Sequence, residues 1–195
     1  PYKQKKKTRA SVAAERGLEP LADVIFAQEQ AECDIIALAA GYVNEEKGVA
    51  SPEEALAGAK DIIAERVSDD AAMRKTLREF LFDEGVITSV YSDKQEDKEK
   101  LVTYEMYKDF SEKIKTLPAH RILALNRGEK DECLKVSVTA DETRAVEKIK
   151  AAFMKPSAFG ELMNEAIEDS YSRLIFPSIE REVRNELTDK ADEQA

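Results

Sequence analysis

Apolar residues recur every three or four positions through most of the chain, which is the spacing of the buried face of a helix. Two such stripes, from Ala55 to Val67 and from Met73 to Leu81, follow one another closely. Ser51 and Pro52 suit the cap and the first turn of the first of these helices, and Gly85 suits the end of the second. The pattern predicts a mainly α-helical fold, built as a multi-helix bundle-like assembly.

Further helices are predicted on both sides of this pair, at 8–16, 18–29, 34–43, 105–115, 141–155, 157–176 and 178–193. Asp34 is the expected cap of the third of these, and Pro177 is expected to break or kink the chain between the last two. The last helix has a thin apolar stripe of Ile179, Val183 and Leu187. We therefore expect it to need a partner outside this chain and to lead into a missing C-terminal domain.

A small β element is predicted to interrupt the helices, at about 86–104 and 134–139. Residues 86–91 are rich in β-branched side chains, 92–100 form a charged turn, and 101–104 are expected to return as a second strand. The alternative is that this whole region is irregular. Residues 134–139 alternate apolar and polar side chains, as a half-buried strand does.

The stretch Leu117–Thr139 is predicted to join two helical groups. Its apolar run 122–125 fits either a helix or a buried strand, and Pro118 at a first turn favours the helix. The triplet Asn-Arg-Gly at 126–128 then predicts a turn. The expected organisation is a basic arm at 1–9, a helical subdomain at 10–116, and a helical subdomain with a short strand at 117–195.

The charge of the chain is unevenly placed. Its 195 residues carry a formal net charge of −10, yet residues 1–9 hold five cations and no acid, so the remainder stands at about −15. Such a body lacks the cations that displace counterions from phosphates, so any nucleic-acid contact must be local. No apolar run reaches the roughly 20 residues of a membrane span, and we expect no membrane contact. Two cysteines, Cys33 and Cys133, are typical of free thiols in a reducing, cytoplasmic location.

No constellation of catalytic residues stands out. The sequence has no phosphate-binding loop, dinucleotide fingerprint, zinc-protease or hydrolase motif, and one histidine cannot build a His-rich metal site. We therefore expect no enzyme activity, no metal and no cofactor. The single histidine, His120, is expected to make a structural hydrogen bond to a helix end or a neighbouring segment. The alternative is a hydrolase in which His120 acts as general base with a carboxylate.

The basic arm is the clearest electrostatic feature of the sequence. Its cations can hold phosphates while Tyr2 stacks on a base, and the alternative is a linker that its charge keeps soluble. A smaller cationic cluster around 121–130 is either a contact patch or a solvated polar turn. The candidate nucleic-acid-binding residues are Lys3, Lys5, Lys6, Lys7 and Arg9, followed by Arg121 and Arg127.

One long stretch resembles a known family. Residues 104–138, read YEMYKDFSEKIKTLPAHRILALNRGEKDECLKVSV, closely resemble the Tex family of bacterial transcription accessory proteins. Four other stretches are similar to the family in the same order, at 1–23, 42–51, 55–79 and 174–195. The resemblance covers nearly the whole chain.

The resemblance implies that the chain is a fragment. Members of the family are longer, and they continue into an RNase-H-like domain, helix–hairpin–helix motifs and an OB-fold that binds RNA. The fragment is then expected to be a non-catalytic helical scaffold that supports RNA binding and transcription regulation in the full-length protein. Its expected partners are RNA, mostly through the absent domains, and RNA polymerase or other transcription proteins. The alternative is a protein-interaction module whose acidic faces contact the transcription or translation machinery.

Overall fold

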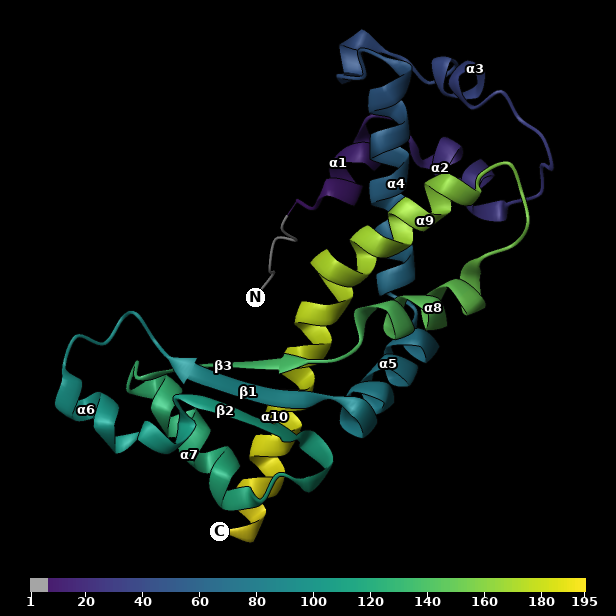
Figure 1. The fold of residues 1–195 in the computed structure, drawn as a ribbon. Helices are drawn as coiled ribbons and strands as arrows, with labels where there is room; N and C mark the ends of the chain where they lie inside the picture. The colour runs from purple at the N-terminus through teal and green to yellow at the C-terminus, as the bar shows by residue number, and fades with distance from the viewer. Residues whose placement is uncertain (1–6) are drawn as a thin grey trace, which may run out of the picture. The chain divides into compact units, whose positions relative to one another are not determined.

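The computed structural model describes residues 7–195 and confirms a mainly α-helical fold (Figure 1). The helices are α1 (Arg9–Glu15), α2 (Glu19–Ala27), α3 (Ile35–Ala40), α4 (Pro52–Ser68), α5 (Ala71–Glu84), α6 (Lys98–Thr103), α7 (Ala119–Lys130), α8 (Glu142–Phe153), α9 (Gly160–Asp169) and α10 (Phe176–Gln194). The short helical turns are η1 (Glu45–Lys47), η2 (Glu105–Tyr107), η3 (Ile114–Thr116) and η4 (Ser170–Ile175). The strands are β1 (Val86–Tyr91), β2 (Asp109–Lys113) and β3 (Leu134–Thr139).

The chain forms two compact units, each built from two separate segments. Unit 1 takes the residues up to Arg74 together with Val146–Phe176, and unit 2 takes Lys75–Ala145 together with Pro177–Ala195. Each unit thus draws on both sides of the boundary that the sequence predicts near residue 117. That 10–116 and 117–195 behave as separate subdomains stays a prediction. Within the described residues, no helix combines the length and the apolar character that crossing a membrane requires.

Unit 1 is organised around α4. This helix contacts α1, α2, α3, α9 and η4, and Figure 1 shows α1, α2 and α9 alongside it. Small and branched side chains make the contact, since Ala55, Ala59 and Ile63 are fully buried. Ion pairs at the rim hold the neighbours in place, from Lys60 Nζ to Glu165 at 2.6 Å on α9 and from Arg66 to Asp23 at 2.5 Å on α2.

The helix starts in unit 1 follow their capping residues. Asp34 accepts a hydrogen bond from the backbone N–H of Ala37 at 3.0 Å, and Ser51 accepts one from Glu54 N–H at 3.2 Å, so both predicted caps are confirmed. The Glu54 carboxylate reaches past Ser51 and accepts from the backbone N–H of Ala50 at 2.7 Å. These bonds satisfy backbone donors that a helix start would otherwise leave without partners.

Unit 2 contains an antiparallel sheet of order β2-β1-β3. The strands predicted at 86–91 and 134–139 are confirmed, and they pair directly from Val86 with Thr139 to Tyr91 with Leu134. The returning strand predicted at 101–104 is wrong, because those residues belong to α6 and to the turn after it. The third strand lies instead at 109–113.

The helix predicted at 105–115 is wrong. That prediction depended on Met106, Phe110 and Ile114, which repeat at helical spacing. In the structure Met106 is 71% exposed, so the apparent helical stripe is not a buried face. Pairing with β1 gives the backbone groups of 109–113 their hydrogen bonds and half-buries Phe110. Tertiary pairing therefore outweighs a weak helical pattern.

Helix α7 begins after Pro118, as predicted, but it runs through the predicted turn at 126–128 to Lys130. The glycine in that turn sequence serves close packing. A Cβ on Gly128 would lie 2.3 Å from Cδ1 and 2.6 Å from Cγ of Leu134, so only a glycine lets α7 approach β3 this closely. The chain turns four residues later, where Glu132 takes a positive φ of 61°.

Helix α10 starts directly after the π-helical turn η4. Proline cannot donate a backbone hydrogen bond, and its ring crowds the preceding turn of a helix. The wider π turn before Pro177 accommodates both the missing hydrogen bond and the ring, so the helix continues without a break. The expected need of this helix for an outside partner is wrong. Ile179, Val183 and Leu187 are buried, with exposed fractions of 2%, 0% and 7%.

Hydrogen bonds within unit 2 fix α10 along the stretch where the apolar stripe is buried. Asn126 Nδ2 donates to Thr188 Oγ1 at 2.8 Å, and the backbone N–H of Val138 donates to Glu180 at 2.8 Å. Arg184 donates to Asn126 Oδ1 at 3.0 Å and also pairs with Glu129. The thin stripe suffices because α7 and β3 lie against it and add polar contacts.

The contact between Gly128 and Leu134 predicts an uneven response to alanine. Gly128→Ala should destabilise the fold by about 1–3 kcal/mol, because a buried leucine cannot retreat from the added methyl without opening the core. Gly160→Ala is the matched control, since a Cβ there meets nothing within 4 Å and alanine favours a helix start over glycine. Urea unfolding followed by circular dichroism measures both. Equal midpoints for the two variants would contradict the packing argument.

Candidate nucleic-acid interface

A groove of about 570 Å³ lies on unit 1, where the basic arm enters the described part of the chain. Four residues of α1 and its C-cap line it at positions i, i+3, i+4 and i+7, the spacing of one helix face. They are Arg9, Val12, Ala13 and Arg16. The opposite wall includes Gly58 of α4, where a Cβ would lie 2.3 Å from Cδ1 of Leu18.

The structure places the arm residues only in part. Lys3, Lys5 and Lys6 lie outside the described residues. Lys7 and Arg9 line the groove, and both side chains are exposed. Lys7 Nζ lies 3.9 Å from the Glu15 carboxylate, but both groups are largely open to solvent, so this pair holds Lys7 weakly.

Two carboxylates also line the groove, and each has a partner. Burial raises the pKa of Asp61, while Arg173 and Arg9 oppose that rise, and Arg173 Nη2 lies 3.9 Å from its carboxylate. Glu54 is engaged with the backbone N–H of Ala50. Both acids of the groove therefore have partners, and Arg9 is one of the charges that act on Asp61. The cations Lys7, Arg9 and Arg16 remain exposed to solvent.

The two candidate cations of α7 differ in their surroundings. Arg121 forms an ion pair with Glu112 of β2, and its guanidinium lies 5.6 Å from the centroid of the Phe110 ring. Arg127 lies six residues further along the helix and is exposed. Only Arg127 therefore presents its charge to solvent without first breaking an ion pair.

His120 lies at the second position of α7 and is exposed. The hydrogen bond that we expected from its ring to a helix end or neighbour is not made among residues 7–195. In particular, no serine or cysteine among the described residues makes a hydrogen bond with it. The nearest chemistry-bearing side chain in the sequence, Arg121, is directed to Glu112.

Two buried polar side chains, Tyr104 and Cys133, lie elsewhere in unit 2. The Tyr104 hydroxyl donates to the Asp131 carboxylate at 2.5 Å, and burial together with this bond raises the pKa of Tyr104 to about 12. Cys133 is fully buried, and burial raises the pKa of its thiol. A thiol that stays protonated is a poor nucleophile, so this cysteine is structural. Within the described residues, no group of His, Cys, Asp and Glu is placed to hold a metal ion.

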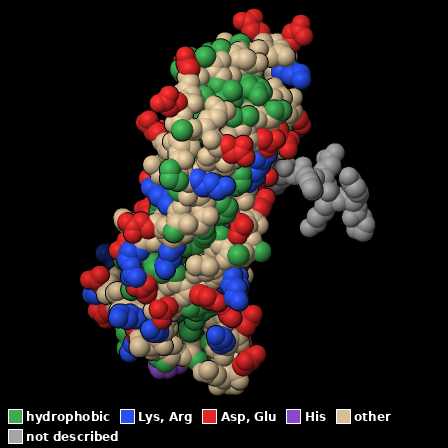
Figure 2. Space-filling model, turned by 90° about the vertical axis from the view of Figure 1, so that its right-hand side faces the viewer, with side chains coloured by type: hydrophobic (Ala, Val, Ile, Leu, Met, Phe, Trp, Pro, Cys, Tyr) green, Lys and Arg blue, Asp and Glu red, His purple; other side chains and the backbone are tan. Residues whose placement is uncertain are grey.

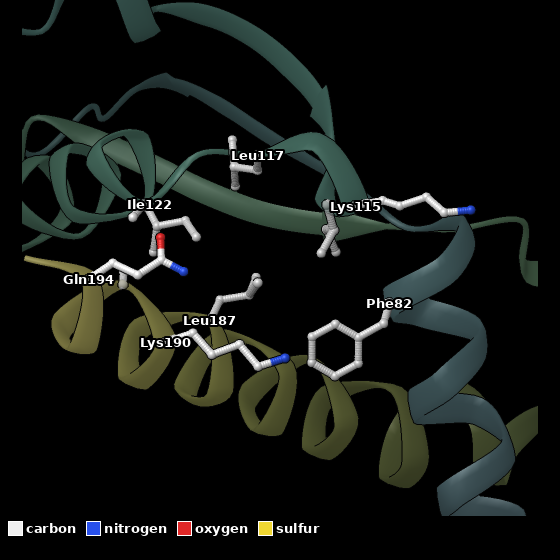
Figure 3. A pocket seen from close by; sticks show the side chains of 10 residues that line it. Phe82, Lys115, Leu117, Ile122, Leu187, Lys190 and Gln194 are labelled. Carbon is white, nitrogen blue, oxygen red and sulfur yellow. The ribbon is translucent and has the colours of Figure 1, made fainter.

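A second hollow, of about 360 Å³, lies within unit 2 and is lined by apolar residues together with two lysines and a glutamine. Figure 3 shows Phe82, Ile122 and Leu187 directed into it from α5, α7 and α10. Its two lysines have partners, since Lys190 Nζ lies 5.3 Å from the Phe82 ring centroid and Lys115 Nζ lies 2.8 Å from Asp83. This hollow therefore offers less to a phosphate than the groove of unit 1.

The charges on the face drawn in Figure 2 are mixed. On this face, Lys and Arg side chains are interspersed with Asp and Glu rather than gathered in a field of one sign. Neighbouring opposite charges cancel beyond about 10 Å at moderate salt. Attraction of a polyanion must therefore depend on a local cluster such as the groove.

The sequence model of the family described as Tex central region-like matches residues 30–195. The chain belongs to the Tex family. It is 47% identical over its whole length to the uncharacterized protein YdcI of Bacillus subtilis and 34% identical over its whole length to the transcriptional accessory protein Tex of Neisseria gonorrhoeae. A more distant relative is the human S1 RNA-binding domain-containing protein 1, at 27% identity over the whole chain.

The chain spans only part of these relatives. It covers 27% of the Bacillus protein, 26% of the Neisseria protein and 20% of the human protein. The activities and partners of a whole Tex protein therefore come to this chain only as proposals.

The candidate residues from the sequence leave out one cation of the groove, Arg16. From the sequence, this residue is expected only to end a helix. Its position seven residues after Arg9 is the signal that identifies it, because two full turns of a helix return the side chain to the same face.

The Tyr104 environment predicts a late phenol ionisation. Burial and the bond to Asp131 raise the pKa of this phenol to about 12, whereas an ordinary tyrosine ionises near 10.0. Its contribution to stability is therefore present below pH 10 and is lost as the pH rises from about 10 to about 12. Tyr104→Phe should remove the late step from a titration of tyrosinate absorbance, and Tyr91→Phe, as a control, should keep it. A late step that survives in Tyr104→Phe contradicts the assignment.

Proposed function

We propose that this chain is a non-catalytic helical scaffold that supports RNA binding and transcription regulation in the full-length protein. The observation that carries the proposal is the groove of unit 1, where Lys7, Arg9 and Arg16 face outward while the acids beside them have internal partners. The arm adds Lys3, Lys5 and Lys6 directly before it in the sequence. Phosphates are the natural counter-charge for such a cluster.

The scaffold role has support from the way each unit is held together. Ion pairs and hydrogen bonds link helices that are far apart in the sequence, such as Lys60 to Glu165 and Asn126 to Thr188. Rigid helices of this kind hold attached domains in a fixed geometry. His120 is exposed and makes no hydrogen bond among the described residues, and Cys133 is buried. Neither side chain is therefore placed as a catalytic group would be.

The names of two relatives support the biological setting. The Neisseria protein is called a transcriptional accessory protein, and the human protein is named for an S1 RNA-binding domain. We extend both roles to the whole protein that contains this chain, with RNA polymerase or other transcription proteins as further proposed partners. We propose a cytoplasmic location on the same grounds.

Within the chain, we propose the arm and Arg9 as the first RNA contacts and Arg127 as a second, weaker one. Arg121 stays a candidate of lower rank because its ion pair with Glu112 must break before it can bind a phosphate. A protein-interaction module that uses acidic faces has less support. The acids in Figure 2 alternate with cations, and a basic partner would meet both signs.

Charge removal in the arm tests the proposal. Replacing Lys3, Lys5, Lys6 and Lys7 with Gln should weaken binding of a fluorescein-labelled 20-nucleotide uridine RNA. Each lost phosphate contact makes the plot of log affinity against log salt shallower by about 0.7, so four should change the slope by up to about 3. Fluorescence polarisation of the 195-residue chain between low and moderate salt measures both quantities.

The matched control removes the same charge elsewhere, by replacing the exposed residues Lys94, Lys98, Lys108 and Lys135 with Gln. This control should bind RNA with nearly the original salt slope. If the two variants weaken binding equally, the arm is no contact and only net charge matters. If the unchanged chain binds no RNA at low salt, the proposed support of RNA binding through this chain is wrong.

A further inference from the structure

Two cationic side chains of unit 1 each lie against a glycine turn. Gly17 and Gly48 have φ angles of +81° and +89°, a backbone conformation that favours glycine. A Cβ on Gly48 would lie 3.4 Å from Nε of Arg16, and a Cβ on Gly17 would lie 3.6 Å from Nζ of Lys47. Each cation therefore rests against the glycine that neighbours the other one. We call this arrangement the Arg16–Lys47 turn pair.

Neither cation has a carboxylate partner among the described residues. Within 7–195, no ion pair within 4 Å and no hydrogen bond involves the guanidinium of Arg16 or the ammonium of Lys47, although Glu45 and Glu46 directly precede Lys47. The hydrogen bond of Lys47 to a side chain is made by its backbone N–H, which donates to Asn44 Oδ1 at 3.4 Å. Both side chains are exposed. Placing two like charges against adjoining turns costs free energy unless an anion joins them.

The charge of Arg16 is not needed to finish its helix. Backbone donors already satisfy the end of α1, where the N–H of Gly17 bonds to Ala14 O at 3.0 Å and the N–H of Leu18 bonds to Ala13 O at 3.2 Å. A glycine with positive φ and these two bonds form a complete helix C-terminal cap. Capping of α1 therefore does not explain why the Arg16 guanidinium lies against the Gly48 turn.

The turn pair continues the cationic face of the groove. Arg9 and Arg16 lie on the same face of α1, and at about 1.5 Å per residue they are separated by roughly 10 Å along the helix. The arm precedes Arg9 in the sequence. A series of spaced cations matches a chain of phosphates better than a single phosphate group.

We propose that Arg16 and Lys47 form a phosphate-binding site for the backbone of an RNA strand that follows α1 from the basic arm. This site rests on the proposed function, to which it adds Arg16 and Lys47 as RNA contacts. Arg16 supplies a planar fork that binds two phosphate oxygens, and Lys47 supplies a second point charge. Contacts to phosphate carry no base preference, so the site accepts RNA of any sequence.

The double variant Arg16→Gln, Lys47→Gln tests the site with the fluorescein-labelled 20-nucleotide uridine RNA. Two lost phosphate contacts should weaken binding at low salt by about tenfold and make the salt slope shallower by about 1.4. The charge-retaining variant Arg16→Lys, Lys47→Arg should keep most of the binding. The variant Lys94→Gln, Lys98→Gln removes equal charge in unit 2 and should keep the original salt slope.

A structural role for the turn pair is tested by the melting temperature. Because neither side chain has a partner in the described structure, the double Gln variant should melt at the same temperature as the original chain. Lost binding together with a lower melting temperature would overturn the proposal, because the turns themselves would then depend on these side chains.

Two further measurements separate this site from the proposed function. If the chain binds the uridine RNA and the double Gln variant binds it equally well, the site is wrong while RNA support through the arm stands. If the chain binds no RNA, but inorganic phosphate shifts the amide signals of Gly17 and Gly48, the turn pair is an anion site and the RNA assignment is wrong. Competition by poly-glutamate as strong as by unlabelled RNA would also overturn the RNA assignment and favour an acidic protein partner.

Discussion

The close contact of α4 with the helices around it is the constraint on which unit 1 depends. The buried face of α4 carries small residues, among them Ala55 and Ala59, and Gly58 lies where Leu18 and Ala13 approach it. Small side chains bring helix backbones near one another, and the interior then has little room to adjust. The position of α1 is fixed by this contact. The groove, its cations and the adjoining glycine turns all follow from where α1 lies.

The groove of unit 1 and the hollow of unit 2 differ in which of their charges have partners. In unit 2, Lys115 and Lys190 border the hollow, and each is occupied by an internal partner. In the groove of unit 1, the acids Glu54 and Asp61 have partners, and the cations Lys7, Arg9 and Arg16 are exposed. The net charge of −10 therefore does not indicate which charges a ligand would contact on the surface. What a polyanion meets depends on which charges the fold has already paired.

Several elements could be predicted because their causes are local. Asp34 and Ser51 cap helices through hydrogen bonds to residues three positions away, and the alternation in 134–139 marks a strand wherever it pairs. The strand at 109–113 and the course of α7 through Gly128 could not be read this way. The first depends on pairing with β1, and the second depends on the space left for Leu134. The candidate site divides similarly, since Lys7 and Arg9 stand out as sequence charge whereas Lys47 does not.

The sequence by itself determined the helical class, most helix starts, two of the three strands, the basic arm and the family. The structural features among these depend on residues close together in the chain. The family is recognised from the similarity of a long stretch of sequence. Only the tertiary structure decided which apolar stripe is covered and which charges are paired. It buried Ile179, Val183 and Leu187 within unit 2 and assigned Arg121 to Glu112. It also brought Arg16 and Lys47 to adjoining turns from positions 31 residues apart. Distances between residues far apart in the chain are set by packing, and no local pattern encodes them.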